Sequence, residues 1–491
     1  MTMRGMELIQ TCDVIVYDYL ANSRFLEHAK KGSEIIYVGK MGGDHTLPQE
    51  KINDLLVRKA KEGKSIARLK GGDPYVFGRG GEEAEELVEA GIEFEVVPGV
   101  TSGVAAAAYA GIPITHRSCT SSLAFITGHE DPTKDESAID WAKISTGIGT
   151  LVFYMGVKNL PYIVEKLVSN GRSTKTPVAL VRWGTTTKHQ TWIGTLENIV
   201  DVAEKGKVTA PSLIIVGEVV SLRPKLGWFE NRPLFGKTII VTRARAQASG
   251  FLSKLQGLGA TTLEFPTIET ADPEDWSPLD NAIGEAGKYD WLIFTSVNGV
   301  AYLLKRLKET GRDIRDLAGP KVCAIGKSTG EAVEALGIKV DLVPDEYRAE
   351  GILESIGDVK GKKILIPRAL EAREVLPDTL REKGAEVDVV TAYRTYRPDT
   401  RKDELLEAIM SGEANMVSFT SSSTVSNFAG MFTDSEFEEV KKKLKVASIG
   451  PITTTTAKKF GFKIDVEPEE YTIDALTGKI VEYYSDAGKD D

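Results

Sequence analysis

The strongest constraint on the fold is an internal repeat in the second half of the 491-residue chain. The block GKTIIVTR at 236–243 returns about 125 positions later as GKKILIPR at 361–368. Three further pairs keep nearly the same offset: FTS at 294–296 and 419–421, KVCAIG at 321–326 and KVASIG at 445–450, and PDEY at 344–347 and PEEY at 468–471. A period of this length has the size of a small domain and not of a solenoid repeat. We therefore predict two related lobes with a ligand between them.

Short β-branched runs alternate with helical patterns throughout each copy of the repeat, which is typical of a doubly wound parallel sheet. Residues 1–225 alternate in the same way without duplication, with strands expected at 13–17, 65–69 and 94–97 among others. The fold class is therefore α/β throughout. We expect domains at 1–225 and 236–484, joined by a linker at 226–235 that contains a proline and aromatic residues.

Composition excludes several classes of partner. Lys and Arg total 61 against 71 Asp and Glu, and the resulting net charge of −10 opposes nonspecific attachment to nucleic acid or an anionic membrane. No apolar run of about 18 residues occurs and the first residues lack a signal peptide, so a cytoplasmic location without membrane contact is expected. The three cysteines are widely separated and form no metal-ligand spacing with histidine, so no metal is expected.

Glycine-rich and hydroxyl-rich loops follow the predicted strands of the first domain, where α/β proteins place ligands. Gly71, Gly72 and Asp73 follow the strand at 65–69, and Thr101 and Ser102 lie in the loop PGVTSG. Paired glycines let a ligand approach the backbone, although a tight strand-to-helix turn needs them as well.

Two ionisable residues also stand at strand ends in this domain. Asp18 follows the strand at 13–17, and Lys40 follows an apolar run at 34–38. An acid/base pair is one interpretation. A turn aspartate and a solvated lysine form the other.

Five motifs of the first domain resemble uroporphyrinogen-III C-methyltransferase, in order and over most of its length: GGDPYVFGRGGEE (71–83), VPGVTSG (97–103), AGIPITHR (110–117), TLVFYMGV (150–157) and PSLIIVGEVV (211–220). The resemblance implies a homodimer that transfers two methyl groups from S-adenosylmethionine to uroporphyrinogen III, giving precorrin-2 for sirohaem and cobalamin. It assigns proton acceptance to Asp18 and proton donation to Lys40. It assigns donor binding to Gly71, Gly72, Asp73, Val76, Thr101, Ser102, Met155 and Gly184.

One departure from that family concerns its opening strand and GxGPGDP loop, which touches the methyl donor. This sequence begins about where that loop has ended, at TMRG. We therefore expect a central strand and part of the cofactor site to be absent from the chain as given.

In the second domain, the repeated blocks place hydroxyls and glycines between strands and helices. The candidate substrate-binding residues are Thr295, Ser296, Thr420, Ser421, Ser422, Gly450 and Thr453. Backbone N–H groups at helix starts, together with such hydroxyls, bind anions, and four blocks at one cleft would suit a ligand with several carboxylates. Ordinary helix capping is the structural alternative for each block.

The motifs FTSVNGV, IPRA, VVTAYRTY, SFTSSSTVSNF and SIGPITTTTAKKFG resemble uroporphyrinogen-III synthase across nearly all of 236–483. That family has two α/β lobes joined by a two-stranded connection, here crossed near Thr267 and Tyr393. The resemblance therefore divides the second domain into lobe A (about 236–266 plus 394–484) and lobe B (about 268–392). The family closes hydroxymethylbilane with inversion of the last ring and loss of water. The resemblance makes Tyr393 the candidate acid, and a structural tyrosine at the hinge is the alternative.

Together these resemblances predict a bifunctional tetrapyrrole enzyme whose C-terminal domain makes the substrate of the N-terminal domain. Two alternatives remain open from the sequence. The methyltransferase could act on another corrinoid intermediate, or the N-terminal unit could be a non-catalytic tetrapyrrole-binding or dimerisation module beside an active synthase.

Overall fold

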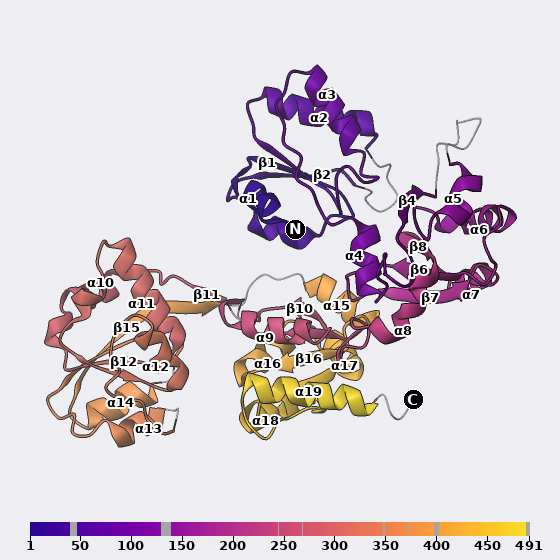
Figure 1. Cartoon of the computed structure of the whole chain (residues 1–491). Coiled ribbons are helices and arrows are strands. Elements are labelled where there is room, and N and C mark those ends of the chain that lie inside the picture. The colour runs from indigo at the N-terminus through magenta and orange to yellow at the C-terminus, as the bar shows by residue number, and fades with distance from the viewer. Residues whose placement is uncertain are drawn as a thin grey trace. The chain divides into compact units, whose positions relative to one another are not determined.

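The computed structural model of the chain describes residues 1–39, 47–128, 139–243, 245–267, 269–346, 349–372, 374–396 and 402–487. They form two compact units, Met1–Lys237 with Gly257–Thr261 and Thr238–Gln256 with Thr262–Asp491 (Figure 1). Every sheet is combined with helices, which confirms the predicted α/β class. No helix in these ranges is long and apolar enough to span a membrane.

The first subdomain of unit 1 is built on a three-stranded parallel sheet in the order β2-β1-β3. Its elements are α1 (Met3–Thr11), β1 (Val14–Tyr17), β2 (Glu34–Tyr37), α2 (Gln49–Lys61), β3 (Ile66–Leu69) and α3 (Gly80–Glu89). Val14 and Val16 of β1 pack with Ile52 and Leu56 of α2, and Leu87 of α3 joins them. This packing places α2 and α3 on one face of the sheet.

The predicted strand at 94–97 is wrong: residues 92–100 have no regular secondary structure. A segment is a strand only when a neighbouring strand accepts and donates its backbone hydrogen bonds, and no strand among the described residues pairs with this one. Instead Glu95 accepts hydrogen bonds from Nε (2.9 Å) and Nη2 (2.7 Å) of Arg4 in α1. Strand β3 is paired only with β1, so one of its edges carries no described strand.

The second subdomain of unit 1 has a mixed five-stranded sheet in the order β4-β5-β8-β6-β7. Its elements are α4 (Ser102–Tyr109), β4 (Leu123–Thr127), α5 (Trp141–Gly147), β5 (Thr150–Tyr154), α6 (Leu160–Ser169), β6 (Pro177–Arg182), β7 (Gln190–Thr195), α7 (Ile199–Lys205), β8 (Ser212–Val216) and α8 (Arg223–Leu226). Ala106 and Ala107 of α4 pack on one face of the sheet, and apolar residues of α6 and α7 pack on the other. Helix α4 begins directly after the loop that leaves the first subdomain, so this loop and α4 form the connection between the two subdomains.

Unit 2 contains two sheets whose layouts explain the repeat. Lobe A has the order β10-β9-β16-β17, and lobe B has the order β11-β15-β14-β12-β13. In lobe A, β9 carries the block GKTIIVTR of the first copy, and β16 and β17 carry the blocks FTS and KVASIG of the second copy. In lobe B, β14 carries GKKILIPR of the second copy, and β12 and β13 carry FTS and KVCAIG of the first copy. Because both runs, β9-β16-β17 and β14-β12-β13, are parallel and in the same order, the repeated blocks occupy equivalent places in the two lobes.

Helices cover both faces of the lobe B sheet, as a doubly wound fold requires. The strands and helices are β11 (Glu269–Ala271), α10 (Ser277–Gly284), β12 (Trp291–Phe294), α11 (Val297–Glu309), β13 (Lys321–Ala324), α12 (Lys327–Glu334), α13 (Ala349–Ser355), β14 (Lys363–Ala369), α14 (Val375–Glu382) and β15 (Glu386–Tyr396). Helices α10, α11 and α12 pack on one face, and α13 and α14 pack on the other. Strand β11 pairs antiparallel with the end of β15, which forms the expected two-stranded connection (Figure 1).

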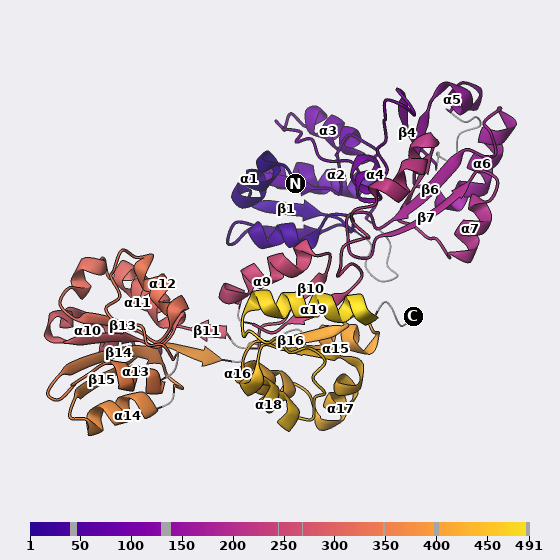
Figure 2. The same ribbon diagram turned by 60° about the horizontal axis from the view of Figure 1, so that its bottom comes forward.

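Lobe A is sandwiched in the same way. Its elements are β9 (Thr238–Val241), α9 (Arg245–Gly257), β10 (Thr261–Glu264), α15 (Lys402–Met410), β16 (Met416–Phe419), α16 (Ser422–Ala429), α17 (Asp434–Lys443), β17 (Lys445–Ser448), α18 (Pro451–Lys459) and α19 (Ile473–Ala487). Figure 2 shows α9 and α19 on one side of the β16 layer and α16, α17 and α18 on the other. Phe419 and Phe428 are buried in the core on the second side.

Candidate active sites

The glycine loop after β3 lies against two other candidate segments of unit 1. A Cβ atom added at Gly71 would lie 2.7 Å from the carbonyl oxygen of Leu20, and one at Gly72 would lie 3.5 Å from Cα of Thr101. Gly72 has a φ of +91°, which favours glycine. The structure therefore brings Gly71 and Gly72 next to the Asp18 turn and to the start of α4.

Asp73 and Thr101 hold this arrangement with side-chain hydrogen bonds. Oδ2 of Asp73 accepts from the backbone N–H of Gly99 (3.0 Å), and its Oδ1 accepts from that of Tyr75 (2.9 Å). The hydroxyl of Thr101 lies 2.7 Å from that of Tyr154, which also accepts from the N–H of Gly103 (2.8 Å). Thr101 thus precedes α4 without capping it by its side chain, and instead ties it to the end of β5.

The remaining donor-binding candidates surround the same helix. Met155 follows Tyr154 with a φ of +55°, and its side chain is exposed. Gly184 packs against α4, because a Cβ there would lie 2.3 Å from that of Ala106. Val76 is partly buried against the core that includes Ala106, and Ser102 is exposed as the first residue of α4. Left-handed backbone in a residue other than glycine is costly and concentrates at functional sites.

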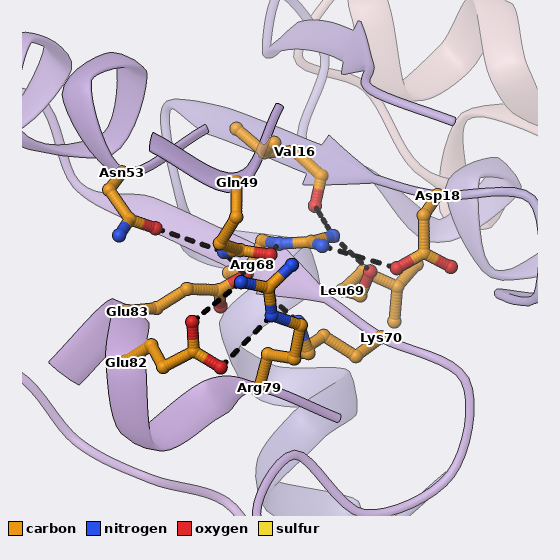
Figure 3. A network of polar contacts seen from close by, with 10 residues as sticks. All are labelled: Val16, Asp18, Gln49, Asn53, Arg68, Leu69, Lys70, Arg79, Glu82 and Glu83. Carbon is orange, nitrogen blue, oxygen red and sulfur yellow. Dashed lines mark hydrogen bonds and ion pairs between the residues drawn. The ribbon is translucent and has the colours of Figure 1, made fainter. Parts of the chain in front are cut away.

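Asp18 belongs to a network of charged groups at the end of β1 (Figure 3). Its Oδ2 accepts from Nη2 of Arg68 at 3.2 Å, and its Oδ1 accepts from the N–H of Leu20 at 3.1 Å. Arg68 and Lys70 both donate to Oε1 of Glu83, at 3.2 and 2.9 Å. Lys40, the proposed partner of Asp18, lies outside the described residues.

Burial acts in opposite senses on the pKa values of this network. Burial would raise the pKa of Glu83, but Arg68, Lys70 and Gln49 outweigh it, so the pKa of this carboxyl lies below its usual range. Burial and the neighbouring Arg68 cation lower the pKa of Lys70, although Glu83 opposes them. The network therefore holds Glu83 as an anion between two cations.

We expect Gly99→Ala to weaken binding of S-adenosylmethionine to unit 1 by about tenfold or more. A Cβ there would lie 2.1 Å from the carbonyl oxygen of Gly72, so the Gly71–Asp73 loop must move, and overpacking of this kind costs about 1–3 kcal/mol. Calorimetric titration of the full chain with the donor measures the change. Gly147→Ala is the control, because its Cβ would meet nothing within 4 Å. Equal affinities of both variants and the wild type would contradict the expectation.

The candidate residues of lobe B meet at the end of β12. The hydroxyl of Ser296 caps α11 by accepting from the N–H of Gly299 (3.0 Å), and it lies 3.0 Å from the hydroxyl of Tyr393. Tyr393 is buried, and its ring stacks on that of Tyr302. Thr295 is half-buried at the same strand end. Ser296 and Tyr393, which were predicted as site residues on separate grounds, therefore lie in contact with each other.

The candidate residues of lobe A gather where α16 and α18 begin. Ser421 caps α16 by accepting from the N–H of Thr424 (3.3 Å), and Gly450 is the N-cap residue of α18. The hydroxyl of Ser422 donates to the carbonyl oxygen of Ile452 (3.3 Å) and accepts from the hydroxyl of Thr456 (3.0 Å). Thr420 is half-buried after β16, and Thr453 is buried in the first turn of α18. Capping, the structural alternative, thus accounts for the side chains of Ser296 and Ser421.

Comparisons with known proteins cover both halves of the chain. Family models described as Tetrapyrrole (Corrin/Porphyrin) Methylases and as Uroporphyrinogen-III synthase HemD match residues 1–200 and 249–478. The porphyrin biosynthesis protein HemD of Ruminiclostridium josui is 37% identical over 98% of this chain and 95% of its own length. The chain belongs to the HemD porphyrin biosynthesis family.

Other relatives of this HemD-family chain match its first half. A uroporphyrinogen-III C-methyltransferase of Priestia megaterium is 54% identical over 45% of the chain and 92% of its own length. A crystal structure of uroporphyrin-III C-methyl transferase from Thermus thermophilus, complexed with S-adenyl homocysteine, is 37% identical and covers 45% of this chain and 93% of its own, with a TM-score of 0.38.

Two arginines of the HemD-family chain, the half-buried Arg243 and the buried Arg368, were not predicted as site residues. Arg243 and Arg368 end the equivalent blocks GKTIIVTR and GKKILIPR. Arg368 is 5% exposed and pairs with Glu374, and burial lowers the pKa of Arg243 below its ordinary value. The repeat itself was the signal for them, because both copies place a cation at the same position of the block.

Proposed function

We propose that this chain makes uroporphyrinogen III in unit 2 and methylates it in unit 1. The observation that carries the proposal is the match along almost the whole chain to one HemD relative, together with family models for both halves. Unit 2 closes hydroxymethylbilane to uroporphyrinogen III with loss of water. Unit 1 then transfers two methyl groups to give precorrin-2, for sirohaem or cobalamin. The 54% identity of unit 1 with a methyltransferase disfavours a non-catalytic module.

The residues around α4 fit S-adenosylmethionine. Gly71 and Gly72 expose backbone without side chains, Ser102 exposes a hydroxyl beside them, and Met155 holds its exposed side chain on a left-handed backbone. With Asp73, Val76, Thr101 and Gly184, they would hold the donor. When bound, it supplies a methyl group already activated for transfer to a nucleophilic carbon. The protein's own task is then to align the substrate and to move a proton.

Asp18 is the proposed proton acceptor, and Lys40 is the proposed proton donor. Asp18 stands at the carboxyl end of β1, beside the Gly71 loop, and its side chain is partly exposed. In the synthase, Tyr393 would assist departure of the hydroxyl group, and the hydroxyls and helix starts near Ser296 and Ser421 would bind substrate carboxylates. We further propose that the activities divide at residues 226–235, that unit 1 forms a homodimer, and that the protein works in the cytoplasm.

The direct test supplies hydroxymethylbilane and S-adenosylmethionine to the purified full chain. We expect the type III isomer without donor, and its dimethylated product with donor, resolved by chromatography and absorbance. Formation of the type I isomer alone would refute the synthase assignment. Accumulation of unmethylated type III isomer in the presence of donor would refute the methyltransferase assignment.

Tyr393→Phe is expected to slow the synthase by about 10²-fold or more if the hydroxyl acts as an acid. The ring and its stacking on Tyr302 remain, so the loss in unfolding free energy should be only that of one hydrogen bond, about 1 kcal/mol. The matched control is Tyr289→Phe, which removes another buried tyrosine hydroxyl of lobe B, bonded to Asp388 at 2.7 Å. Equal initial rates for the two variants would favour the structural role for Tyr393.

A further inference from the structure

The charged network that ends at Asp18 connects residues of three elements of the first subdomain, β3, α2 and α3 (Figure 3). Arg68 lies on β3 opposite Val16 of β1, so both side chains point to the face covered by α2 and α3. There Glu83, in the first turn of α3, accepts from Arg68, Lys70 and the amide of Gln49. The network therefore links the sheet to both of its covering helices.

Exposure increases along the network toward Asp18. The accessible fractions of the side chains are 6% for Glu83, 9% for Lys70, 13% for Arg68 and 27% for Asp18. Three of the four charged groups are thus enclosed, and Asp18 is the member that faces outward. A buried ionic cluster gives little net stability compared with apolar packing, so stability alone does not account for this network.

Arg68 is held from several directions at once. Its Nε donates to Glu83 at 3.2 Å, its Nη1 donates to the carbonyl oxygens of Leu69 (3.1 Å) and Val16 (3.5 Å), and its Nη2 donates to Asp18. A planar guanidinium has five N–H donors in fixed directions, which is enough for these four acceptors, whereas a lysine ammonium has only three. Its contacts with both strands and with α3 leave it little freedom to rotate.

We propose that Arg68 is a positioning residue for methylation: it fixes the Asp18 carboxylate at the exposed end of the network, beside the Gly71 loop, and Glu83 in turn fixes Arg68. This inference rests on the proposed methyltransferase function and on the proposed proton transfer by Asp18. Arg68 does not touch the reacting atoms. It orients the carboxylate and compensates its charge, while the N–H of Leu20 holds the other carboxylate oxygen.

The test is a double-mutant cycle in the full chain with Arg68→Lys, Asp18→Asn and the two combined. Lysine keeps the charge but cannot donate to Glu83, the strand carbonyls and Asp18 together. We expect Arg68→Lys to lower kcat for methylation by about 10²-fold, the scale of a misplaced catalytic group, with KM for uroporphyrinogen III and donor affinity within twofold of wild type. In the Asp18→Asn background, the same change should alter kcat by less than twofold.

A control variant and two outcomes complete the test. Lys59→Gln breaks the ion pair with Glu34 in the same subdomain and should leave kcat unchanged. Suppose that the wild type methylates its substrate. If the double variant then loses kcat by the product of the two single losses, or if donor affinity falls together with kcat in Arg68→Lys, the proposed positioning role of Arg68 is wrong. If wild type transfers no methyl group, the proposed function itself fails, and this inference fails with it.

Discussion

Asp18→Asn is expected to lower methylation by about 10²–10⁴-fold while leaving donor binding intact. The amide oxygen can still accept from the N–H of Leu20, so the turn beside Gly71 should keep its shape, but the amide loses the hydrogen bond from Arg68 to the other oxygen and cannot take up a proton. The donor-binding candidates, by contrast, lie in the glycine loop and around α4. Transfer of radiolabelled methyl to uroporphyrinogen III gives the rate, and calorimetry gives the donor affinity.

Asp54→Asn provides the matched control, because Asp54 is an exposed carboxylate of α2 in the same subdomain. It should methylate at the wild-type rate. Full activity of Asp18→Asn would remove Asp18 from proton transfer. Loss of donor affinity together with activity would instead place Asp18 in the cofactor site.

The repeat was the most reliable guide to the fold, because the same blocks must occupy equivalent places in two sheets. The repeat alone does not set the bounds of the lobes, which came from the resemblance to the synthase; in the structure the blocks 236–243 and 361–368 carry strands of two different sheets. The strand expected at 94–97 failed for a related reason. Its apolar residues fit a strand, but strand pairing depends on a neighbour that local sequence does not reveal.

The charged network around Glu83 could not be predicted from the sequence either. Glu83 lies in an acidic stretch, GGEEAEE, that resembles a solvated helix face, and its burial depends on contacts with Arg68 and Gln49 from distant positions. The contact between Ser296 and Tyr393 joins residues 97 positions apart. Motif resemblance could nominate Asp18 and Tyr393, but only the three-dimensional structure identifies the groups that hold them.

Glu83→Gln is expected to lower the free energy of unfolding of unit 1 by about 3–5 kcal/mol at neutral pH, because it removes the enclosed anion that Lys70 and Arg68 share and leaves Arg68 with Asp18 alone. Replacing Trp276 and Trp291 by phenylalanine leaves tryptophans only in unit 1, so fluorescence during urea unfolding reports that unit alone. The neighbouring Glu82→Gln breaks only the half-exposed pair with Arg79 and should cost less than about 1 kcal/mol. Equal losses for the two variants would contradict the buried role of Glu83.

The same substitution should change the pH dependence of unit 1. The pKa of Glu83 is lower in the folded protein than its usual value of 4.5, so the unfolded chain binds the proton more readily. The stabilisation from this carboxylate is therefore fully present above about pH 5 and is lost as the pH falls below 4.5 and through the lower folded pKa. Glu83→Gln has no such proton to bind, so the gap in unfolding free energy between wild type and variant should narrow over that range. A gap of constant size between pH 7 and pH 3 would show that Glu83 stabilises unit 1 by shape and not by charge.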